Sequence, residues 1–256
     1  MSRPGVLVTG AAVRLGAAIA RAFARAGWQV AIHYRSSADD AEALAGQLSD
    51  AFTVRCDLSD TQDMQRMVDT VSRRMTDWRA VVNCAAVFEP DGFDALDRAV
   101  FDTAMAINAR APIELAQMFL RKGADGPART VINITDQKLL NSNPDFFSYT
   151  LSKHAFDGSI AMLAKGFPRH RTYGLAPGAI LPSHDQDEEE IEISHRLNLL
   201  ARKTGANEIG QAAVFLAEGE MRSGQTLYVD SGQHLLNQPR DVIYLARDKE
   251  TEGGSA

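Results

Sequence analysis

The sequence lacks the features that mark several classes of protein. Only two of its 256 residues are cysteines, and we expect Cys56 and Cys84 to be small core residues in a reducing compartment rather than a disulfide or metal pair. The net charge of −6 and the lack of a basic block argue against nucleic acid as a partner. No apolar stretch approaches the length of a membrane span. The apolar run Gly5 to Val8 begins too early to leave room for a signal peptide, so we expect a cytoplasmic protein that binds no membrane.

Short apolar runs and amphipathic stretches alternate along the chain. We expect strands at 5–8, 29–34, 52–56, 80–83, 129–135, 172–175 and 225–229, and helices at 17–25, 39–48, about 60–75, 98–122, 147–165 and 207–218. This alternation predicts an α/β fold, a single-domain Rossmann-type doubly wound parallel sheet with helices on both faces. We assign residues 1–236 to that domain. Residues 237–256 are expected to form a C-terminal tail that is partly ordered or crosses to a neighbouring subunit.

A glycine-rich turn follows the first strand. Gly10, Arg14, Leu15 and Gly16 lead into a helix, whose free N–H groups are suited to a diphosphate. The second strand ends in His33-Tyr34-Arg35-Ser36, without the acidic residue that holds the ribose of NAD. A guanidinium and hydroxyls there suit the 2′-phosphate of NADP, so we expect NADPH as the cofactor. The alternative is a tight turn followed by a solvated polar loop.

Tyr149 and Lys153 stand four residues apart on one face of a predicted helix. An adjacent ammonium favours the phenolate, so we expect Lys153 to lower the pKa of Tyr149 and Tyr149 to act as a general acid. Asp136 follows the fifth predicted strand, at the edge where open α/β sheets bind ligands. The alternative for Asp136 is a residue that caps the loop after the strand.

These motifs together resemble the short-chain dehydrogenase/reductase family over about residues 5–236. The resemblance implies that Asn108, Tyr149 and Lys153 belong to a catalytic set, in which Asn108 anchors a water near Lys153. It also implies a set of cofactor contacts: Gly10, Arg14, Leu15, Gly16, His33, Tyr34, Arg35, Ser36, Asp57, Leu58, Asn83, Ala85, Tyr149, Lys153, Pro177 and Gly178.

Two departures from the common pattern narrow the resemblance. Arg14 stands where ordinary members carry glycine, and Asp136 stands where they carry serine; both are typical of the pteridine reductase branch, which includes the dihydromonapterin reductases. Phe88 falls where that branch has an aromatic residue that stacks on the pterin. Ala86 replaces a serine that often reaches the pterin in that branch, and Cys84 replaces a usual asparagine.

The resemblance implies NADPH-dependent reduction of a 7,8-dihydropterin, such as dihydromonapterin or dihydrobiopterin, to the tetrahydropterin. The expected substrate contacts are Arg14, Phe88, Asp136 and Tyr149, with Asp136 also in the catalytic set. It further implies a homotetramer with contacts through 98–122 and 147–165. The apolar run Val242 to Leu245 is expected to reach a neighbouring subunit, with Arg240 or Arg247 near its active site.

Other functions remain open at this point. A reductase of a ketone or a 3-oxoacyl thioester is one alternative, although the acidic run Asp185 to Glu190 disfavours an acidic acyl-carrier protein. A catalytically silent NADP-binding sensor is another, although such proteins typically lose the tyrosine or the lysine. His184 beside the acidic run matches no ligand spacing, so we expect no metal.

Overall fold

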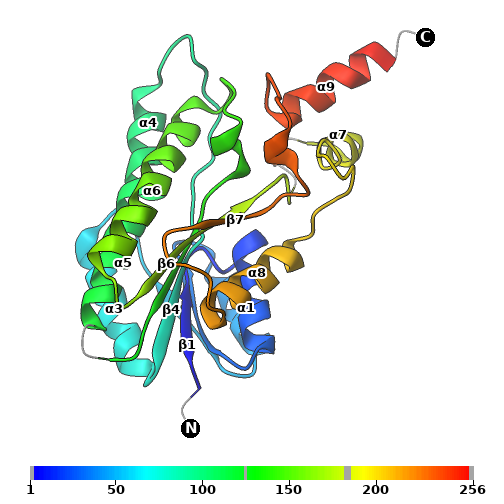
Figure 1. Cartoon of the computed structure of the whole chain (residues 1–256). Coiled ribbons are helices and arrows are strands. Elements are labelled where there is room, and N and C mark those ends of the chain that lie inside the picture. The colour runs from blue at the N-terminus through cyan, green and yellow to red at the C-terminus, as the bar shows by residue number, and fades with distance from the viewer. Residues whose placement is uncertain (1–2, 124–125, 182–185, 254–256) are drawn as a thin grey trace.

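One parallel sheet forms the centre of the chain, for which the computed structural model describes residues 3–123, 126–181 and 186–253 (Figure 1). Its seven strands lie in the order β3-β2-β1-β4-β5-β6-β7. They are β1 (Gly5–Val8), β2 (Gln29–Tyr34), β3 (Ala51–Arg55), β4 (Trp78–Asn83), β5 (Thr130–Ile134), β6 (Arg171–Pro177) and β7 (Thr226–Val229). The order reverses between β1 and β4, and such switch points are where doubly wound sheets bind ligands. The predicted fold class is confirmed.

Helices cover both faces of the sheet (Figure 1). On one face lie α1 (Arg14–Arg25), α2 (Ala38–Gln47) and α8 (Ala206–Glu218); on the other lie α3 (Thr61–Arg74), α5 (Ala111–Lys122) and α6 (Phe147–Gly166). Successive side chains of a strand point to opposite faces, so Val6 and Val8 belong to one core and Leu7 to the other. In the described ranges, no helix combines the length and the apolar character needed to cross a membrane.

The helix predicted over 98–122 is interrupted. It consists of α4 (Arg98–Ala104), a π-helical turn (Met105–Arg110) and then α5. Pro112 has no N–H group, so it cannot donate the α-helical hydrogen bond to the main-chain carbonyl of Asn108, and a wider turn accommodates this missing donor. Asn108 lies in that turn and is 1% exposed.

The C-terminal tail packs on its own chain in this structure. It follows a 3₁₀ turn (Gln233–Leu235) and ends in α9 (Val242–Gly253), which lies near α7 (Glu188–Ser194) (Figure 1). Val242 and Ile243 are both buried, and Ile243 forms an apolar cluster with Phe146 and Tyr149. A reach of this segment to a neighbouring subunit stays a prediction.

Gly16 allows the turn after β1 to fold tightly against the start of α1. A Cβ atom at Gly16 would lie 2.2 Å from the carbonyl oxygen of Gly10 and 2.9 Å from the Cα of Ala11. Both are main-chain atoms, so neither moves aside without opening the turn. Any side chain at this position therefore deforms the turn.

We expect Gly16→Ala to lower the free energy of unfolding by about 1–3 kcal/mol, the typical cost of an overpacked buried site. Gly46→Ala is the matched control, because a Cβ atom at Gly46 in α2 meets nothing within 4 Å. That control should be neutral or stabilising by up to about 1 kcal/mol, since alanine is the better helix former. Urea unfolding measures both, and equal effects in the two variants would contradict the tight turn.

Candidate active site

His33 supports the glycine turn from beneath. Its Nδ1 accepts a hydrogen bond from the main-chain N–H of Gly10 at 3.0 Å, and its Nε2 is 3.1 Å from the carbonyl oxygen of Cys56. These partners require a neutral ring with the proton on Nε2. Burial lowers the pKa of His33 to about 4, which keeps the ring neutral.

The expected role of His33 as a phosphate contact needs correction, because both of its ring nitrogens already have main-chain partners. Its neighbours Tyr34, Arg35 and Ser36 do line the cavity beside the glycine turn, and Arg35 and Ser36 are exposed. The strand end therefore offers a guanidinium and a hydroxyl to an anion. His33 holds the turn in which such an anion would bind.

This first cavity has a volume of about 350 Å³ and extends from the glycine turn to the end of β3. Gly10 lies there at φ +62°, and a Cβ atom on it would come within 3.0 Å of Ala85, so the main chain approaches the cavity closely. Of the expected cofactor contacts, those that line it are Gly10, Arg14, Leu15, Gly16, His33, Tyr34, Arg35, Ser36, Leu58 and Ala85.

Two expected cofactor residues have side chains that bond to other parts of the chain. Asn83 is 3% exposed and lines neither cavity; its Nδ2 donates to Asn133 Oδ1 at 2.9 Å and to the carbonyl of Pro112 at 3.3 Å. Asp57 also lies outside the cavity lining, and its carboxylate accepts two hydrogen bonds from Ser59, at 2.9 and 2.7 Å. Their expected contacts with the cofactor stay predictions.

Arg14 adopts a left-handed backbone conformation, with φ +53°. A residue with a side chain in this region carries a cost of about 1–2 kcal/mol that glycine avoids. Arg14 lines the first cavity and also a second one, so its strained position places a guanidinium where the two cavities meet. Such strain at a cavity junction is typical of a functional residue.

The second cavity adjoins the first and has a volume of about 290 Å³. The two share Arg14, Leu15, Cys84 and Ala86. Cys84 therefore lies at a cavity wall; Cys56 is fully buried, as expected, and also lines the first cavity. Of the expected site residues, those that line the second cavity are Arg14, Leu15, Phe88, Asp136, Tyr149, Lys153, Pro177 and Gly178.

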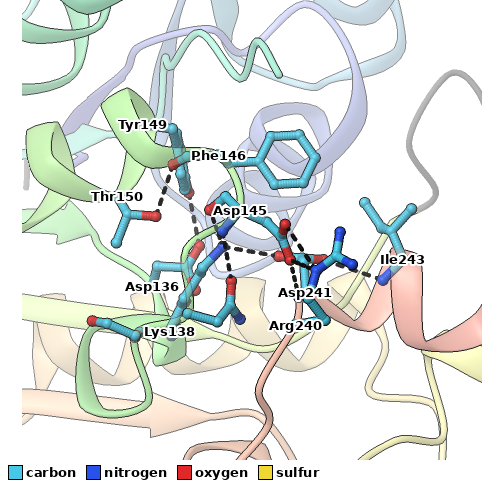
Figure 2. Close-up of polar contacts among 11 residues, drawn as sticks. Asp136, Lys138, Asp145, Phe146, Tyr149, Thr150, Arg240, Asp241 and Ile243 are labelled. Atoms are coloured by element: carbon cyan, nitrogen blue, oxygen red, sulfur yellow. Dashed lines mark hydrogen bonds and ion pairs between the residues drawn. The ribbon is translucent and has the colours of Figure 1, made fainter. Parts of the chain in front are cut away.

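Asp136 and Tyr149 meet in this cavity. The Tyr149 hydroxyl donates to Asp136 Oδ2 at 2.8 Å (Figure 2). The other carboxylate oxygen accepts from the main-chain N–H of Lys138 at 2.8 Å and caps the 3₁₀ turn Gln137–Leu140. The sequence left open whether Asp136 caps a turn or belongs to the site. In the structure it does both: one carboxylate oxygen caps the 3₁₀ turn and the other accepts from Tyr149.

The pKa of Tyr149 is raised well above its usual value, so the expected lowering needs correction. Burial is the main cause, and the neighbouring Asp136 carboxylate adds to it. Lys153 does not reverse this effect, because its Nζ lies 5.7 Å from the centre of the Tyr149 ring and donates to the carbonyl of Ile134 at 2.8 Å. Burial also raises the pKa of Asp136 and lowers that of Lys153. The free site therefore holds a firmly protonated phenol.

Asn108 lines neither cavity and connects the site to the loop after β4. Its Nδ2 donates to the carbonyl of Val87 at 2.9 Å and to Ser152 Oγ at 3.0 Å, and its Oδ1 accepts from the N–H of Val87 at 2.8 Å. Asn108 thereby fixes the residue before Phe88 and the residue before Lys153. Its expected contact with a water stays a prediction.

Phe88 belongs to an aromatic cluster at the cavity. Its ring stacks on Phe146, with centroids 4.1 Å apart, and meets the Tyr149 ring edge-on at 4.6 Å. The Phe88 side chain is still 37% exposed. A second flat ring can therefore contact the part of Phe88 that faces the cavity.

Sequence reasoning missed Asp91, which fixes both the Phe88 loop and the start of α6. The Asp91 carboxylate accepts from the N–H of Ser148 at 3.0 and 3.1 Å and from its hydroxyl. The α6 N-cap residue, Phe146, offers no acceptor side chain, so Asp91 caps the helix from a distance. Sequence patterns identify a capping residue only when it directly precedes its helix, and Asp91 lies 57 positions before Ser148.

It also missed Lys138 and Asp241, which pair beside the site across 103 residues of chain. His195 and Gln186 line the second cavity as well.

His184 and Asp185, considered above as metal ligands and as part of an acidic run, lie outside the described residues. Within the described part of the chain, no group of three His, Cys, Asp or Glu side chains is arranged to hold a metal ion.

We expect the His33→Asn variant to lose part of the acid sensitivity of folding. The unfolded His33 takes up a proton below its ordinary pKa of 6.5, whereas the folded residue does so only near 4. Stability from this group is therefore complete above pH 6.5 and is lost as the pH falls toward 4, by about 3 kcal/mol in all. Urea unfolding of both proteins at pH 7 and pH 4.5 measures the difference, and an identical loss in both would contradict a buried neutral His33.

Known proteins resemble the chain over nearly its whole length. Residues 10–234 match a short-chain dehydrogenase family model that is described as enoyl-(acyl carrier protein) reductase. Pteridine reductase 1 of Leishmania tarentolae is 27% identical, over 91% of this chain and 96% of its own. The 7alpha-hydroxysteroid dehydrogenase of Escherichia coli K12 is 28% identical, over 88% and 92%.

A solved structure shows the same fold at higher identity. FolM alternative dihydrofolate reductase 1 from Brucella canis, complexed with NADP, is 36% identical and superposes with a TM-score of 0.88 over 94% of this chain and 97% of its own. The family match spans most of the sequence, and the glycine turn, Tyr149 and Lys153 occupy one edge of the sheet. The chain therefore belongs to the short-chain dehydrogenase/reductase family of nicotinamide-dependent oxidoreductases.

Proposed function

We propose that the chain reduces a 7,8-dihydropterin to the tetrahydropterin with NADPH. The observation that carries this proposal is the 2.8 Å hydrogen bond between the Tyr149 hydroxyl and the Asp136 carboxylate in the second cavity. Similarity to a pteridine reductase and to an alternative dihydrofolate reductase supports it. Dihydromonapterin and dihydrobiopterin are the substrates that we consider first.

The residues of the first cavity fit the adenosine and diphosphate parts of NADPH. Gly10 and Gly16 let the main chain come close to a diphosphate, at the start of α1. Arg35 and Ser36 offer donors to a 2′-phosphate. Pro177 and Gly178 line the second cavity, where the nicotinamide would lie.

The carboxylate of Asp136 favours a pterin over a ketone. It has about four acceptor positions, and two of them are used by Lys138 N and Tyr149 Oη. The remaining positions can accept from the amino group and a ring N–H of a pterin. A ketone develops negative charge at its oxygen during reduction, which a nearby carboxylate would repel.

Phe88 would hold the flat heterocycle from one side. It already stacks on Phe146 and retains exposed surface, so its position in the cavity is fixed before a substrate enters. An offset-stacked ring pair contributes about 1 kcal/mol beyond the burial of its area. Arg14, at the junction of the cavities, can bond both a diphosphate and an edge of the ring.

Tyr149 supplies the proton of the reaction. When bound, reduced nicotinamide delivers a hydride to the carbon of a ring C=N bond, and the nitrogen of that bond then needs one proton. Tyr149 donates its proton to this nitrogen and regains one through Asp136 or from solvent. Because its pKa is raised, Tyr149 gives up the proton only as the nitrogen becomes strongly basic, and this ties proton transfer to hydride arrival.

Lys153 positions Tyr149 and the ribose beside it. Its ammonium is fixed by the carbonyl of Ile134 at 2.8 Å and retains further donors for ribose hydroxyls. Tyr149 and Lys153 are both present, so the chain retains the two residues that a silent NADP-binding sensor typically loses.

We also propose that the chain assembles as a homotetramer, as its family resemblance implies. The outer surface of α6 presents large apolar side chains, with Met162 68% and Leu151 39% exposed. Phe93 and Leu96, just before α4, are 71% and 54% exposed. Surfaces of this kind are typical of contacts between subunits.

We expect the purified protein to oxidise NADPH with 7,8-dihydrobiopterin and to show little turnover with an acetoacetyl thioester. Tyr149→Phe should lower kcat at least about 100-fold, since a general acid contributes that much, and should leave NADPH affinity within about twofold. Absorbance at the NADPH band measures turnover, and nucleotide fluorescence measures binding. Turnover with the thioester alone would contradict the pterin assignment, and unchanged turnover in the variant would mean that another group donates the proton.

Asp136→Ser tests the substrate class directly, because serine is the residue of ordinary members of the family. We expect at least about a 100-fold loss of kcat/KM for dihydrobiopterin, since acceptors for the pterin edge and the relay to Tyr149 disappear together. NADPH affinity should stay near that of the unsubstituted protein, because Asp136 lies outside the first cavity. Undiminished dihydrobiopterin reduction in this variant would exclude Asp136 as a substrate contact.

A further inference from the structure

Residues 240–243 of the C-terminal tail lie close to Asp145 and Phe146 at the start of α6 (Figure 2). Asp241, Val242 and Ile243 line the second cavity together with Asp136 and Tyr149. Val242 and Ile243 are each only 7% exposed, and Ile243 belongs to a small apolar cluster with Phe146 and Tyr149. The tail is therefore part of the wall around the proposed substrate position.

A buried ion pair holds this wall in place. Lys138 Nζ lies 3.2 Å from Asp241 Oδ2, and the two side chains are 4% and 13% exposed. Lys138 Nζ also donates to the carbonyl of Asp145 at 2.7 Å and lies 5.4 Å from the centre of the Phe146 ring. Removing one partner of a desolvated pair leaves the other charge buried and uncompensated, so the two groups hold each other strongly.

The two other ion pairs of the segment each have a more exposed partner. Arg240 Nε donates to both carboxylate oxygens of Asp145, at 3.0 and 2.8 Å, but its side chain is 44% exposed. Arg247 Nε lies 2.6 Å from Glu190 Oε1 and its side chain is 34% exposed. Ion pairs open to solvent contribute little to stability, and Lys138–Asp241 is the most deeply buried of these three pairs. The main-chain N–H of Asp241 adds a hydrogen bond to Asp145 Oδ2 at 2.8 Å.

Lys138 also touches the reacting carboxylate. The main-chain N–H of Lys138 donates to Asp136 Oδ1 at 2.8 Å, while its side-chain ammonium bonds to Asp241 (Figure 2). The Lys138 charge also offsets part of the rise that burial causes in the pKa of Asp136. Lys138 thus bonds to Asp136 through its main chain and to the wall through its side chain. A change of the Lys138 side chain leaves this main-chain donor intact.

We propose that Lys138 is a positioning residue that holds residues 241–243 as the outer wall of the substrate cavity, and that this wall makes the site select compact dihydropterins. The proposal rests on the pterin function above. The cavity volume of about 290 Å³ lies at the lower end of the range for ligand pockets. Because the nicotinamide would occupy part of the same cavity, the space left suits a bicyclic ring with a short substituent. The long aminobenzoyl-glutamate substituent of dihydrofolate requires the wall to move.

The test compares Lys138→Met and Asp241→Asn, which break the same ion pair from its two ends. Asp241→Asn keeps the shape of the side chain and guards against a variant that fails to fold. The matched control is Lys122→Met, which breaks the exposed pair of Lys122 with Asp69, 2.9 Å long with side chains 38% and 41% exposed. Full-length proteins are used throughout.

In both test variants, we expect amide hydrogen exchange in residues 241–247 to become at least about tenfold faster, because the tail opens more often. The ratio of kcat/KM for 7,8-dihydrobiopterin to that for 7,8-dihydrofolate should fall at least about fivefold, through KM rather than kcat. NADPH affinity should stay within about twofold, and Lys122→Met should match the unsubstituted protein in every measurement.

Unchanged amide exchange in residues 241–247 of both test variants would show that Lys138 does not hold the tail. An unchanged ratio of kcat/KM for the two substrates would show that the wall does not select compact substrates. A fall of kcat alone, with both KM values unchanged, would equally contradict a wall that acts on binding. If the unsubstituted protein reduces neither pterin, the proposed function fails, and the exchange measurement still decides whether Lys138 holds the tail, because it needs no substrate.

Discussion

The hydrogen bond between Tyr149 and Asp136 is the interaction on which the organisation of the site depends. It joins the end of β5 to the first turns of α6, two segments that the sheet brings to the same edge. The second carboxylate oxygen is bound to the N–H of Lys138, so Asp136 has little rotational freedom. The aromatic contacts of Phe88 and the wall formed by the tail are arranged around this pair.

Burial gives this hydrogen bond its chemical meaning. In water a phenol and a carboxylate would titrate independently, but here burial raises the pKa of both Tyr149 and Asp136 and lowers that of Lys153. The proton consequently stays on Tyr149 until a stronger base appears nearby. A site of this kind suits a reaction in which hydride arrival creates that base, as in the reduction of a ring C=N bond.

The sequence predicted what depends on local pattern. Strands, helices and the edge that carries Asp136, Tyr149 and Lys153 followed from apolar periodicity and from the rule that ligands bind at strand ends. The predicted direction of the Tyr149 pKa shift was wrong. The shift depends on the depth of burial and on the distance to the Asp136 carboxylate, and neither can be read from the sequence. The bonds of the His33 ring to Gly10 and Cys56 and that of Asn83 to Asn133 also join residues far apart in the sequence. The Lys138–Asp241 pair spans 103 positions without any local signal. The π-helical turn at Asn108 was readable in principle from Pro112, which denies the helix one donor.

A crystal structure with NADP and a 7,8-dihydropterin tests the central claim most directly. The account predicts the pterin ring against Phe88, with Asp136 within hydrogen-bonding distance of the amino group or a ring N–H and with the Tyr149 hydroxyl near the nitrogen that receives the proton. A pterin bound elsewhere, or an Asp136 carboxylate turned away from the ring and from Tyr149, would contradict it.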